Sequence, residues 1–296
     1  MNLRLKFLAL SFGMVMLAIS LGIAVPACTK NNTPMKIGTN LWLGYEPLYL
    51  AQKQGLIDTH KSHLVEYTSA SQVIRAYRNG VIDAAALTLD EALLLLENQF
   101  QPKIALVLDI SNGADVILGQ PGITRFEQLK HKRIGVEDSA LGAYVLSRAL
   151  EISHMRVDDV TVISMEMNKH ERAFTHRDVD AVVTFEPVKS RLLAQSANVL
   201  FDSRQIAGEI VDVLVVDSQY YDKHPDNVTA LKKAWFKALA YIHQFPLDAA
   251  VIMRSRQKLS IAEFNTAYKG IHFPDKAEND RLLDVANPSS DRKSVV

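Results

Sequence analysis

Carboxylate side chains recur in this sequence directly after short apolar runs, where a strand is expected to give way to a helix or a loop. Neither Lys nor Arg stands among the residues at these strand ends. A pocket for a bare small anion usually contains a cation, so a set of acids argues against such a ligand. We therefore expect a ligand with an amine or another partly cationic, hydrogen-bond-donating group, and an additional acid group at a helix end stays open. The acids concerned are Glu46, Asp90, Glu91, Glu137, Asp138 and Glu186.

Aromatic and glycine residues stand at the same positions. Trp42 lies between an apolar run and Gly44, where an indole ring can stack on a ligand. Gly44 and Gly142 let the backbone turn or approach a ligand closely. Together with their neighbours these residues form the predicted ligand site, which consists of Asn40, Trp42, Gly44, Tyr45, Glu46, Ser69, Thr88, Asp90, Glu91, Ser139, Leu141, Gly142, Phe185 and Glu186.

Several of these residues also fit a purely structural role. Thr88 and Glu91 have the spacing of a capping box, which satisfies backbone N–H groups at a helix start. Ser69 and Ser139 fit N-cap positions, and Trp42 fits a core position. In the functional interpretation, the backbone N–H groups at 140–143 open a helix and hold an anionic group. The sequence leaves both interpretations open.

The residue patterns of hydrolases and zinc enzymes are absent from the sequence. It contains neither a His-Glu-x-x-His pattern nor a Gly-x-Ser-x-Gly pattern. His170 and His176 are expected to be solvated residues at a helix end. We therefore predict no catalytic residues, no metal and no cofactor, and a protein that is not an enzyme.

Elements that alternate between strand and helix must position the predicted site. Short apolar runs such as 36–42, 83–88, 133–137 and 180–185 are typical of strands, and the amphipathic stretches between them are typical of helices. A helix is also expected at 126–132. This alternation indicates βαβ units and mainly parallel sheets.

The sequence contains an internal similarity. RAYRNGVIDAAALT begins at Arg75, and RAFTHRDVDAVVTF begins 97 residues later at Arg172. KIGTNLWLGY begins at Lys36, and RIGVEDSALGAY begins at Arg133 with the same offset of 97 residues. Two blocks in the same order indicate a duplicated α/β unit, although βαβ units also resemble one another without duplication.

We interpret the chain as two similar α/β lobes. Lobe 1 is predicted to comprise 35–114 and 207–283, and lobe 2 to comprise 115–206. Segments 110–119 and 210–217 would cross between the lobes as a hinge, and the cleft between the lobes would hold the ligand. Residues 284–296 are polar and aperiodic, and we interpret them as a disordered or truncated tail.

The N-terminal stretch is typical of an export signal. Arg4 and Lys6 precede an apolar run from Phe7 to Ile23, and small residues follow up to Cys28, the only cysteine. We predict a signal peptide over 1–27 and a tether over 28–34. Lipidation of Cys28, conventional cleavage after Ala27 and an uncleaved anchor remain open. The lone thiol excludes an internal disulfide.

The charge balance bears on possible partners. The sequence has 33 Lys and Arg against 33 Asp and Glu, a formal net charge of zero. A nucleic-acid footprint requires a clustered basic surface, so we expect no nucleic-acid partner. We expect a monomer.

At WLGYEPLYLAQKQGL, TLDEALLLLE, GVEDSALGAY and VDAVVTFEPV the sequence resembles the substrate-binding proteins of ATP-driven (ABC) importers. The group it resembles comprises the nitrate, sulfonate, taurine and thiamine-precursor binding proteins, the NMT1-like family, and the resemblance covers about residues 35–275. It implies the two-lobed type II periplasmic binding protein fold, an α/β fold with a hinge and an interlobe cleft. It also implies capture of a small polar solute and its delivery to a membrane permease of the ABC type.

The resemblance supports cleft roles for Trp42, Thr88, Ser139 and Glu186, and a lipid anchor at Cys28. The expected location is periplasmic or at the cell surface, on a membrane-anchored lipoprotein. The same fold also serves sensory proteins that present a ligand to a partner, and a pyrimidine-precursor enzyme. The enzyme would require a cysteine-rich motif, which this sequence does not have.

Overall fold

The computed structural model describes residues 34–97, 100–137 and 139–284. The predicted signal peptide, Cys28, Asp138 and the tail beyond Asp284 lie outside the described residues. The described chain belongs to one compact unit that begins at Pro34, so the lobe boundaries drawn from the sequence stay a prediction. Across the described part of the chain, the helices are too short or too polar to cross a bilayer.

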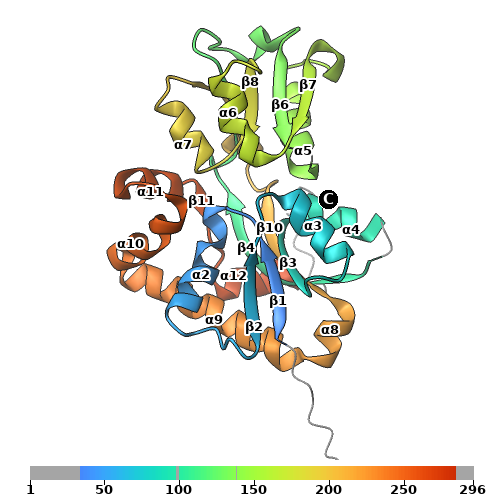
Figure 1. Cartoon of the computed structure of the whole chain (residues 1–296), viewed down its shortest axis with the longest axis vertical. Helices are drawn as coiled ribbons and strands as arrows, with labels where there is room; N and C mark the ends of the chain where they lie inside the picture. The colour runs from blue at the N-terminus through green and yellow to red at the C-terminus, as the bar shows by residue number, and fades with distance from the viewer. Residues whose placement is uncertain (1–33, 98–99, 138, 285–296) are drawn as a thin grey trace, which may run out of the picture. The chain divides into compact units, whose positions relative to one another are not determined.

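Two sheets organise the chain (Figure 1). In the first sheet β1 lies parallel to β2 and β3, and β10 lies antiparallel between β3 and β4. Its strands, in spatial order, are β11 (Ile271–His272), β4 (Pro102–Ser111), β10 (Val211–Asp217), β3 (Ala84–Thr88), β1 (Met35–Thr39) and β2 (Ser62–Glu66).

The second sheet is built from one continuous stretch of the chain. Here β6 lies parallel to β7 and β8, and β5 lies antiparallel between β8 and β9. The spatial order is β7 (Thr161–Met165), β6 (Arg133–Glu137), β8 (Ala181–Thr184), β5 (Val116–Gly119) and β9 (Asn198–Asp202).

The two sheets repeat one arrangement, as the sequence similarity predicted. Ile37 pairs with Ala84 in the first sheet, and Ile134 pairs with Ala181 in the second. Both partners are shifted by the same 97 residues between the sheets. In the first sheet the antiparallel strand beside β3 is β10, which belongs to the return crossing. In the second sheet the antiparallel strand beside β8 is β5, which belongs to the outward crossing. Each sheet therefore takes its antiparallel strand from a segment that has just crossed from the other sheet.

Helices follow the strands at the positions that the sequence pattern predicts, with bounds within a few residues. The region 126–132 is an exception, because only a 3₁₀ turn, η2 (Phe126–Leu129), forms there. The helices that follow strands are α2 (Glu46–Lys53), α3 (Ala70–Arg78), α4 (Leu89–Glu97), α5 (Ala140–Ile152), α6 (His170–Thr175) and α7 (Val188–Leu193). Three further 3₁₀ turns precede or join them, η1 (Leu43–Tyr45), η3 (Val157–Asp159) and η4 (Met167–Lys169).

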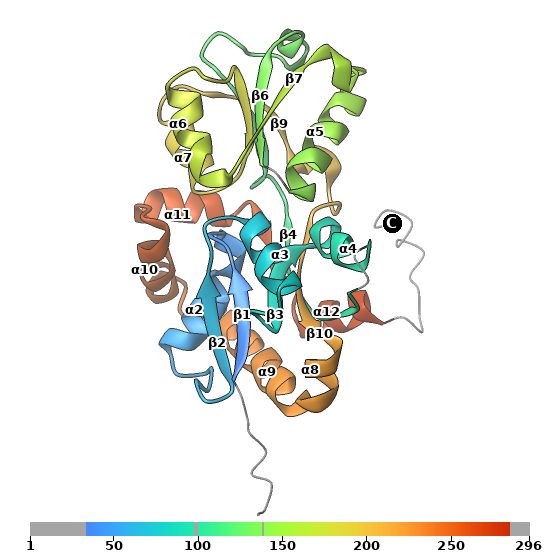
Figure 2. The same ribbon diagram turned by 45° about the vertical axis from the view of Figure 1, so that its right-hand side comes forward.

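The C-terminal helices pack in the half of the unit that contains the first sheet (Figures 1 and 2). Helix α9 contacts α2 and β4, and α10 contacts α2. Helix α9 buries Val228, Leu231, Trp235 and Ala238, whose spacing of three and four residues makes one apolar face. The C-terminal helices are α8 (Ser218–Lys223), α9 (Pro225–Gln244), α10 (Pro246–Gln257), α11 (Ile261–Tyr268) and α12 (Lys276–Leu283). The 3₁₀ turn η5 (Ser203–Ile206) instead follows β9 and contacts it.

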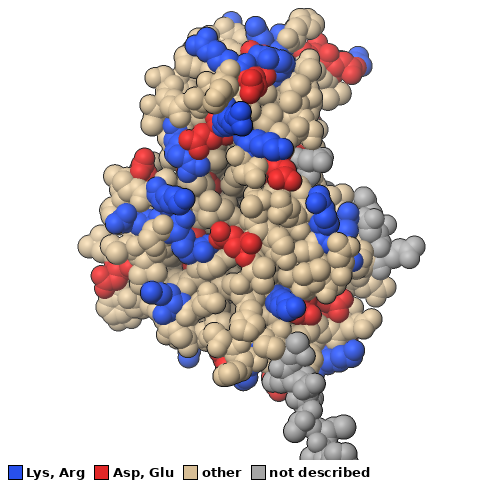
Figure 3. Space-filling model, in the orientation of Figure 1, with Lys and Arg blue, Asp and Glu red and all other residues tan. Residues whose placement is uncertain are grey.

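Surface charges are mixed in sign. Figure 3 shows Lys and Arg side chains interspersed with Asp and Glu over the face drawn. That pattern agrees with the equal numbers of basic and acidic residues in the sequence.

Candidate functional site

A cavity lies where strand ends of both sheets come together. The space inside it that can hold the centre of a water molecule is about 20 Å³, which is room for about one water. The cavity is therefore closed to a solute in this structure. Its lining residues are Asn40, Trp42, Tyr45, Ala70, Thr88, Glu91, Asp115, Glu137, Leu141, Phe185 and Asp212.

Half of the predicted ligand site is brought together here. Asn40, Trp42, Tyr45, Thr88, Glu91, Leu141 and Phe185 line the cavity, and Gly142 lines a smaller adjoining one. The remaining predicted residues are Gly44, Glu46, Ser69, Asp90, Ser139 and Glu186, which lie behind the wall or on other surfaces.

The Trp42 side chain is hydrogen-bonded to a buried carboxyl group. Its indole Nε1 donates to both Oδ1 and Oδ2 of Asp109, at 3.3 Å each. Gly44 makes this contact possible, because a Cβ at that position would lie 2.0 Å from Asp109 Oδ2 and 2.3 Å from Trp42 Nε1. The Trp42 ring meets Phe185 edge to face at a centroid distance of 5.4 Å. Gly44 thus leaves the room that the contact between Trp42 and Asp109 needs.

Tyr45 stands on a second buried carboxyl group. Its hydroxyl donates to Asp212 Oδ1 at 2.5 Å. Asp212 is the register partner of Asp109 on the neighbouring strand. Burial raises the pKa of both carboxyls well above the usual range, and the charge of Asp109 raises that of Asp212 further. Burial therefore favours the protonated form of each carboxyl beneath the two aromatic rings.

Glu91 combines the structural and the functional interpretation. One carboxylate oxygen, Oε2, accepts the N–H of Thr88 at 3.1 Å, which is half of the predicted capping box. The other oxygen, Oε1, is buried and has no hydrogen-bond partner among the described residues. Burial, followed by the charges of Asp90 and Glu137, raises the pKa of Glu91 to about 8. Asp90 itself does not line the cavity, and burial raises its pKa.

Glu137 reaches from the second sheet to a helix of the first. Its Oε1 accepts the backbone N–H of Ala70, the first residue of α3, at 3.2 Å. Ser69 caps the same helix by accepting the N–H of Gln72 at 3.4 Å. The N-cap interpretation of Ser69 is therefore confirmed.

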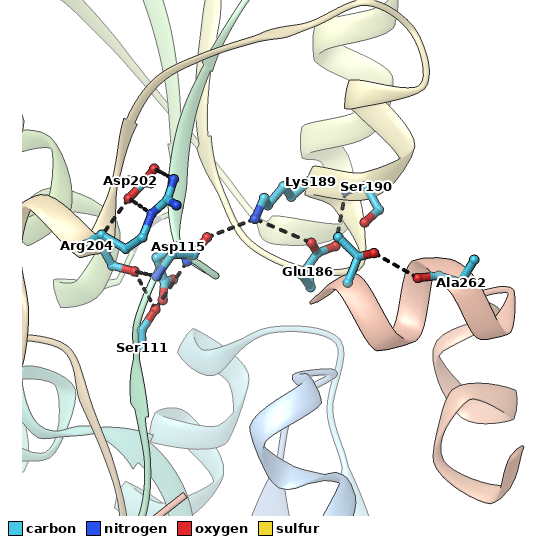
Figure 4. Close-up of polar contacts among 11 residues, drawn as sticks. Ser111, Asp115, Glu186, Lys189, Ser190, Asp202, Arg204 and Ala262 are labelled. Atoms are coloured by element: carbon cyan, nitrogen blue, oxygen red, sulfur yellow. Dashed lines mark hydrogen bonds and ion pairs between the residues drawn. The ribbon is translucent and has the colours of Figure 1, made fainter. Parts of the chain in front are cut away.

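Glu186 contacts the start of α7, next to the outward crossing segment (Figure 4). Its Oε2 accepts the N–H of Ser190 at 3.1 Å, and its Oε1 lies 3.7 Å from Lys189 Nζ. Lys189 in turn donates to the carbonyl oxygen of Gly113 at 2.8 Å. The carboxylate of Glu186 therefore faces Lys189 and α7 rather than the cavity.

Ser203, at the start of η5, contacts the outward crossing segment at Ser111 and Gly113. Ser203 Oγ lies 2.8 Å from Ser111 Oγ and accepts the N–H of Gly113 at 2.6 Å. Asp115, which lies just beyond Gly113 in the sequence, lines the cavity. Its N–H donates to Ser111 Oγ at 3.3 Å. Burial raises the pKa of Asp115 to about 6.

Glu46 faces a different groove. Its Oε1 accepts from Gln257 Nε2 at 2.5 Å and from Arg256 Nε at 3.2 Å, both on α10. The groove lies between α2 and α10. Burial raises the pKa of Glu46 to about 7. The structure thus separates Glu46 from the other predicted acids.

Ser139 occupies the N-cap position of α5, but its side chain makes no capping hydrogen bond. It lines a surface groove between α5 and β7 instead of the cavity.

The prediction that His170 is solvated is wrong. Its side chain is buried, with Nδ1 3.3 Å from Thr184 Oγ1, and burial lowers its pKa to about 4. Within the described ranges, His, Cys, Asp and Glu form no group of three suited to a metal ion.

Four cavity residues lie outside the predicted ligand site: Glu137, which stood only among the strand-end acids, and Ala70, Asp115 and Asp212, which the sequence did not indicate. Asp115 and Asp212 lie on or beside the crossing strands, whose neighbours are set by contacts distant in sequence. A usable signal does exist, because each is the lone acid near the start of an otherwise apolar run, and a buried acid needs a partner or a function. Ala70 contributes its backbone N–H, which no side-chain pattern reveals.

Comparison with known proteins decides the family. A family model described as the NMT1-like family matches residues 29–254. The chain belongs to the NMT1-like family. A candidate binding protein of Brucella abortus (strain 2308) is 28% identical over 195 residues, which covers 62% of this chain. The match spans only 56% of that protein's own length.

Solved structures show the same fold. The ligand-binding component of an ABC-type import system from Staphylococcus aureus, with zinc bound, has a TM-score of 0.71 at 16% identity, covering 89% of this chain and 96% of that one. The periplasmic aliphatic sulphonate binding protein of Escherichia coli has a TM-score of 0.69 at 19% identity, covering 84% and 89%. This NMT1-like chain therefore has the α/β two-sheet fold of periplasmic binding proteins, as the sequence predicted.

Proposed function

We propose that this chain is an extracytoplasmic solute-binding protein that captures a small polar, amine-bearing solute in the cavity and delivers it to an ABC-type importer. Membership of the NMT1-like family supports the binding role. The names of both solved relatives above describe binding components, and one is named as part of an ABC-type import system. We propose a binding protein rather than an enzyme on the same grounds.

The observation that carries the solute class is the acidity of the lining. Four carboxyl groups face the cavity, and its described lining includes neither Lys nor Arg. Glu91 offers a buried oxygen that lacks a partner among the described residues. An ammonium or amidinium group would donate hydrogen bonds to carboxyl oxygens of this lining and would favour their ionised form. The carboxyl groups are Glu91, Asp115, Glu137 and Asp212.

The aromatic residues supply the rest of the binding energy. Trp42, Tyr45 and Phe185 line the cavity, and aromatic rings attract cations that lie over their faces. Trp42 and Tyr45 are held in place by hydrogen bonds to buried carboxyls. Such a lining can orient a solute, exclude water and release the solute unchanged, so no covalent step is needed.

The location and the anchor belong to the same proposal. The leader pattern and Cys28 support export and lipid attachment, with conventional cleavage after Ala27 as the alternative. Mass spectrometry of the mature protein decides between them, because a lipidated N-terminal cysteine adds the mass of its acyl chains.

A thermal-shift screen of the purified protein tests the solute class. The compounds are sulfonates, taurine, nitrate, aminopyrimidines, amino acids and polyamines. A solute at about 100 times its dissociation constant stabilises the fold by about 2.7 kcal/mol, which gives a measurable increase in melting temperature. We expect stabilisation by amine-bearing compounds.

A matched pair of variants ties a positive result to the cavity. Glu91→Gln removes the carboxyl group that could ionise against a bound amine and should weaken amine binding at least tenfold, whereas the exposed Glu127→Gln should leave the affinity unchanged. Stabilisation by bare anions alone would contradict the amine class and keep the binding role. A clean cooperative melt with no response to any compound would favour a partner-presenting, sensory role.

A further inference from the structure

The amino-terminal end of α3 forms part of the cavity wall. Helix α3 has nine residues, and its first residue, Ala70, lines the cavity. The first N–H groups of a helix have no partner inside the helix and attract anions. In a binding protein this is a suitable place to hold the oxyanion of a solute.

In this chain a carboxylate from the opposite sheet already occupies that place. Glu137, the last residue of β6, accepts the Ala70 N–H through Oε1 at 3.2 Å. Ser69 Oγ accepts the N–H of Gln72, so a second early N–H of the helix is also taken. Glu137 is buried and itself lines the cavity. An oxyanion approaching Ala70 would therefore meet a negative charge at the helix end.

A second, independent feature points to a cationic solute in the same cavity. Glu91 lines the cavity, and its buried Oε1 has no hydrogen-bond partner among the described residues. The wall thus combines an unpartnered carboxyl oxygen, which an amine could contact, with a helix end that Glu137 already occupies.

We propose that Glu137 sets the charge selectivity of the cavity: its carboxylate fills the amino-terminal end of α3 and thereby excludes oxyanion-bearing solutes. This inference rests on the proposed function only in taking the cavity as the solute site. It makes Glu137 a specificity-determining residue, and its removal should create an anion site that the native protein lacks.

The test is a gain of binding. Methanesulfonate and sulfate are titrated calorimetrically, at constant ionic strength, into the full-length protein and its variants. The native protein should show no saturable binding in the millimolar range. Glu137→Ala should bind at least tenfold more tightly, because the Ala70 N–H and the space beside it become free. Glu137→Gln keeps the size and one acceptor but loses the charge, so it should give a smaller gain.

Two controls locate the effect. Glu127→Ala removes an exposed acid from the same sheet half and should bind no oxyanion. Ala70→Pro, added to Glu137→Ala, removes the N–H in question and should reverse most of the gain. Proline is tolerated there because Ala70 is the first residue of α3 and Ser69 before it is extended.

The outcomes separate this inference from the amine proposal. If Glu137→Ala and Glu137→Gln both melt cooperatively and bind oxyanions no better than the native protein, Glu137 does not set the selectivity. Saturable oxyanion binding by the native protein overturns both proposals. A gain in Glu137→Ala that Ala70→Pro reverses supports the inference, even if the native protein responds to no amine.

Discussion

At the scale of single residues, the cavity depends on buried acids that serve as supports. Asp109 and Asp212 hold Trp42 and Tyr45 from beneath, and neither acid is expected to be ionised in its buried position. A neutral acid can act as an acceptor without the desolvation cost of a charge. The aromatic part of the wall is therefore positioned by hydrogen bonds rather than by ion pairs.

Gly44→Ala tests the close packing beneath Trp42. The new Cβ would lie 2.0 Å from Asp109 Oδ2, so Trp42 and Asp109 must separate. We expect a loss of about 1–3 kcal/mol in the free energy of unfolding, as for other overpacked sites. Urea denaturation measures it, with the exposed Ser147→Ala as the control substitution. Equal stability of the Gly44→Ala and native proteins would show that the contact is not needed.

Glu91 makes the stability of the empty protein depend on pH. Its pKa rises from the ordinary 4.5 to about 8 on folding, so the folded protein keeps a proton that the unfolded chain has lost. Stability should therefore fall as the pH rises from about 4.5 to about 8. Urea denaturation at several pH values measures this slope, to which Glu46 and Asp115 contribute with the same sign.

The variant Glu91→Gln isolates the contribution of this group. It should flatten the slope, whereas Glu127→Gln should leave it as in the native protein. An unchanged slope in Glu91→Gln would mean that Glu91 is ionised in the folded protein.

At the scale of elements, short polar contacts join η5 to the outward crossing segment, in addition to the apolar packing of residues such as Val116 and Leu118. Ser203 begins η5, just after β9, and Ser111 ends β4, so one hydroxyl pair joins the outward and return paths of the chain. The backbone at Gly113 completes the contact. Such a joint fixes where the two paths meet.

Ser203→Ala should weaken this joint. It leaves the Gly113 N–H without its partner, whereas Ser111 Oγ still accepts the Asp115 N–H. An unsatisfied buried group costs about 1–3 kcal/mol. The free energy of unfolding in urea measures the loss. Ser255→Ala, on the exposed face of α10, serves as the control and should change stability by less than about 0.5 kcal/mol. A Ser203→Ala loss no larger than that of the control would mean that water replaces the hydroxyl.

At the scale of the whole molecule, one apolar core joins the two sheets. A single cluster of buried side chains includes Ile37 and Leu106 from the first sheet and Leu118 and Val182 from the second. The chain also passes between the sheets twice. Smaller apolar clusters belong to each sheet alone, so the shared cluster and the two crossings of the chain are what couple the sheets.

We therefore expect the two sheets to unfold in one transition. Trp42 and Trp235, both in the half of the first sheet, report through fluorescence, and circular dichroism reports on all helices and strands. The two unfolding curves in urea should coincide. A second transition seen only by circular dichroism would show that the second sheet unfolds separately.

The local sequence pattern predicted most of the fold, but only half of the residues predicted for the ligand site line the cavity. Strand and helix positions, and the duplicated arrangement, follow from periodicity within each segment, as at Ile37 and Ile134. The direction of an acid depends instead on partners distant in the chain. Glu46 turns to Arg256 and Gln257, over 200 residues away, and Asp212 is brought to the cavity by strand pairing with Asp109. His170 is buried because Thr184 and the second sheet cover it.

The exchange of crossing strands also orders the steps by which the chain can fold. All strands of the second sheet come from 116–202, whereas β3 and β4 of the first sheet share no neighbour until β10, at 211–217, is available. During synthesis from the N-terminus, all strands of the second sheet are therefore available before β10 is. Strands β3 and β4 stay without their shared neighbour until β10 has been made. Because these contacts join segments far apart in the sequence, we expect pairing of β10 with β3 and β4 to be the slower step.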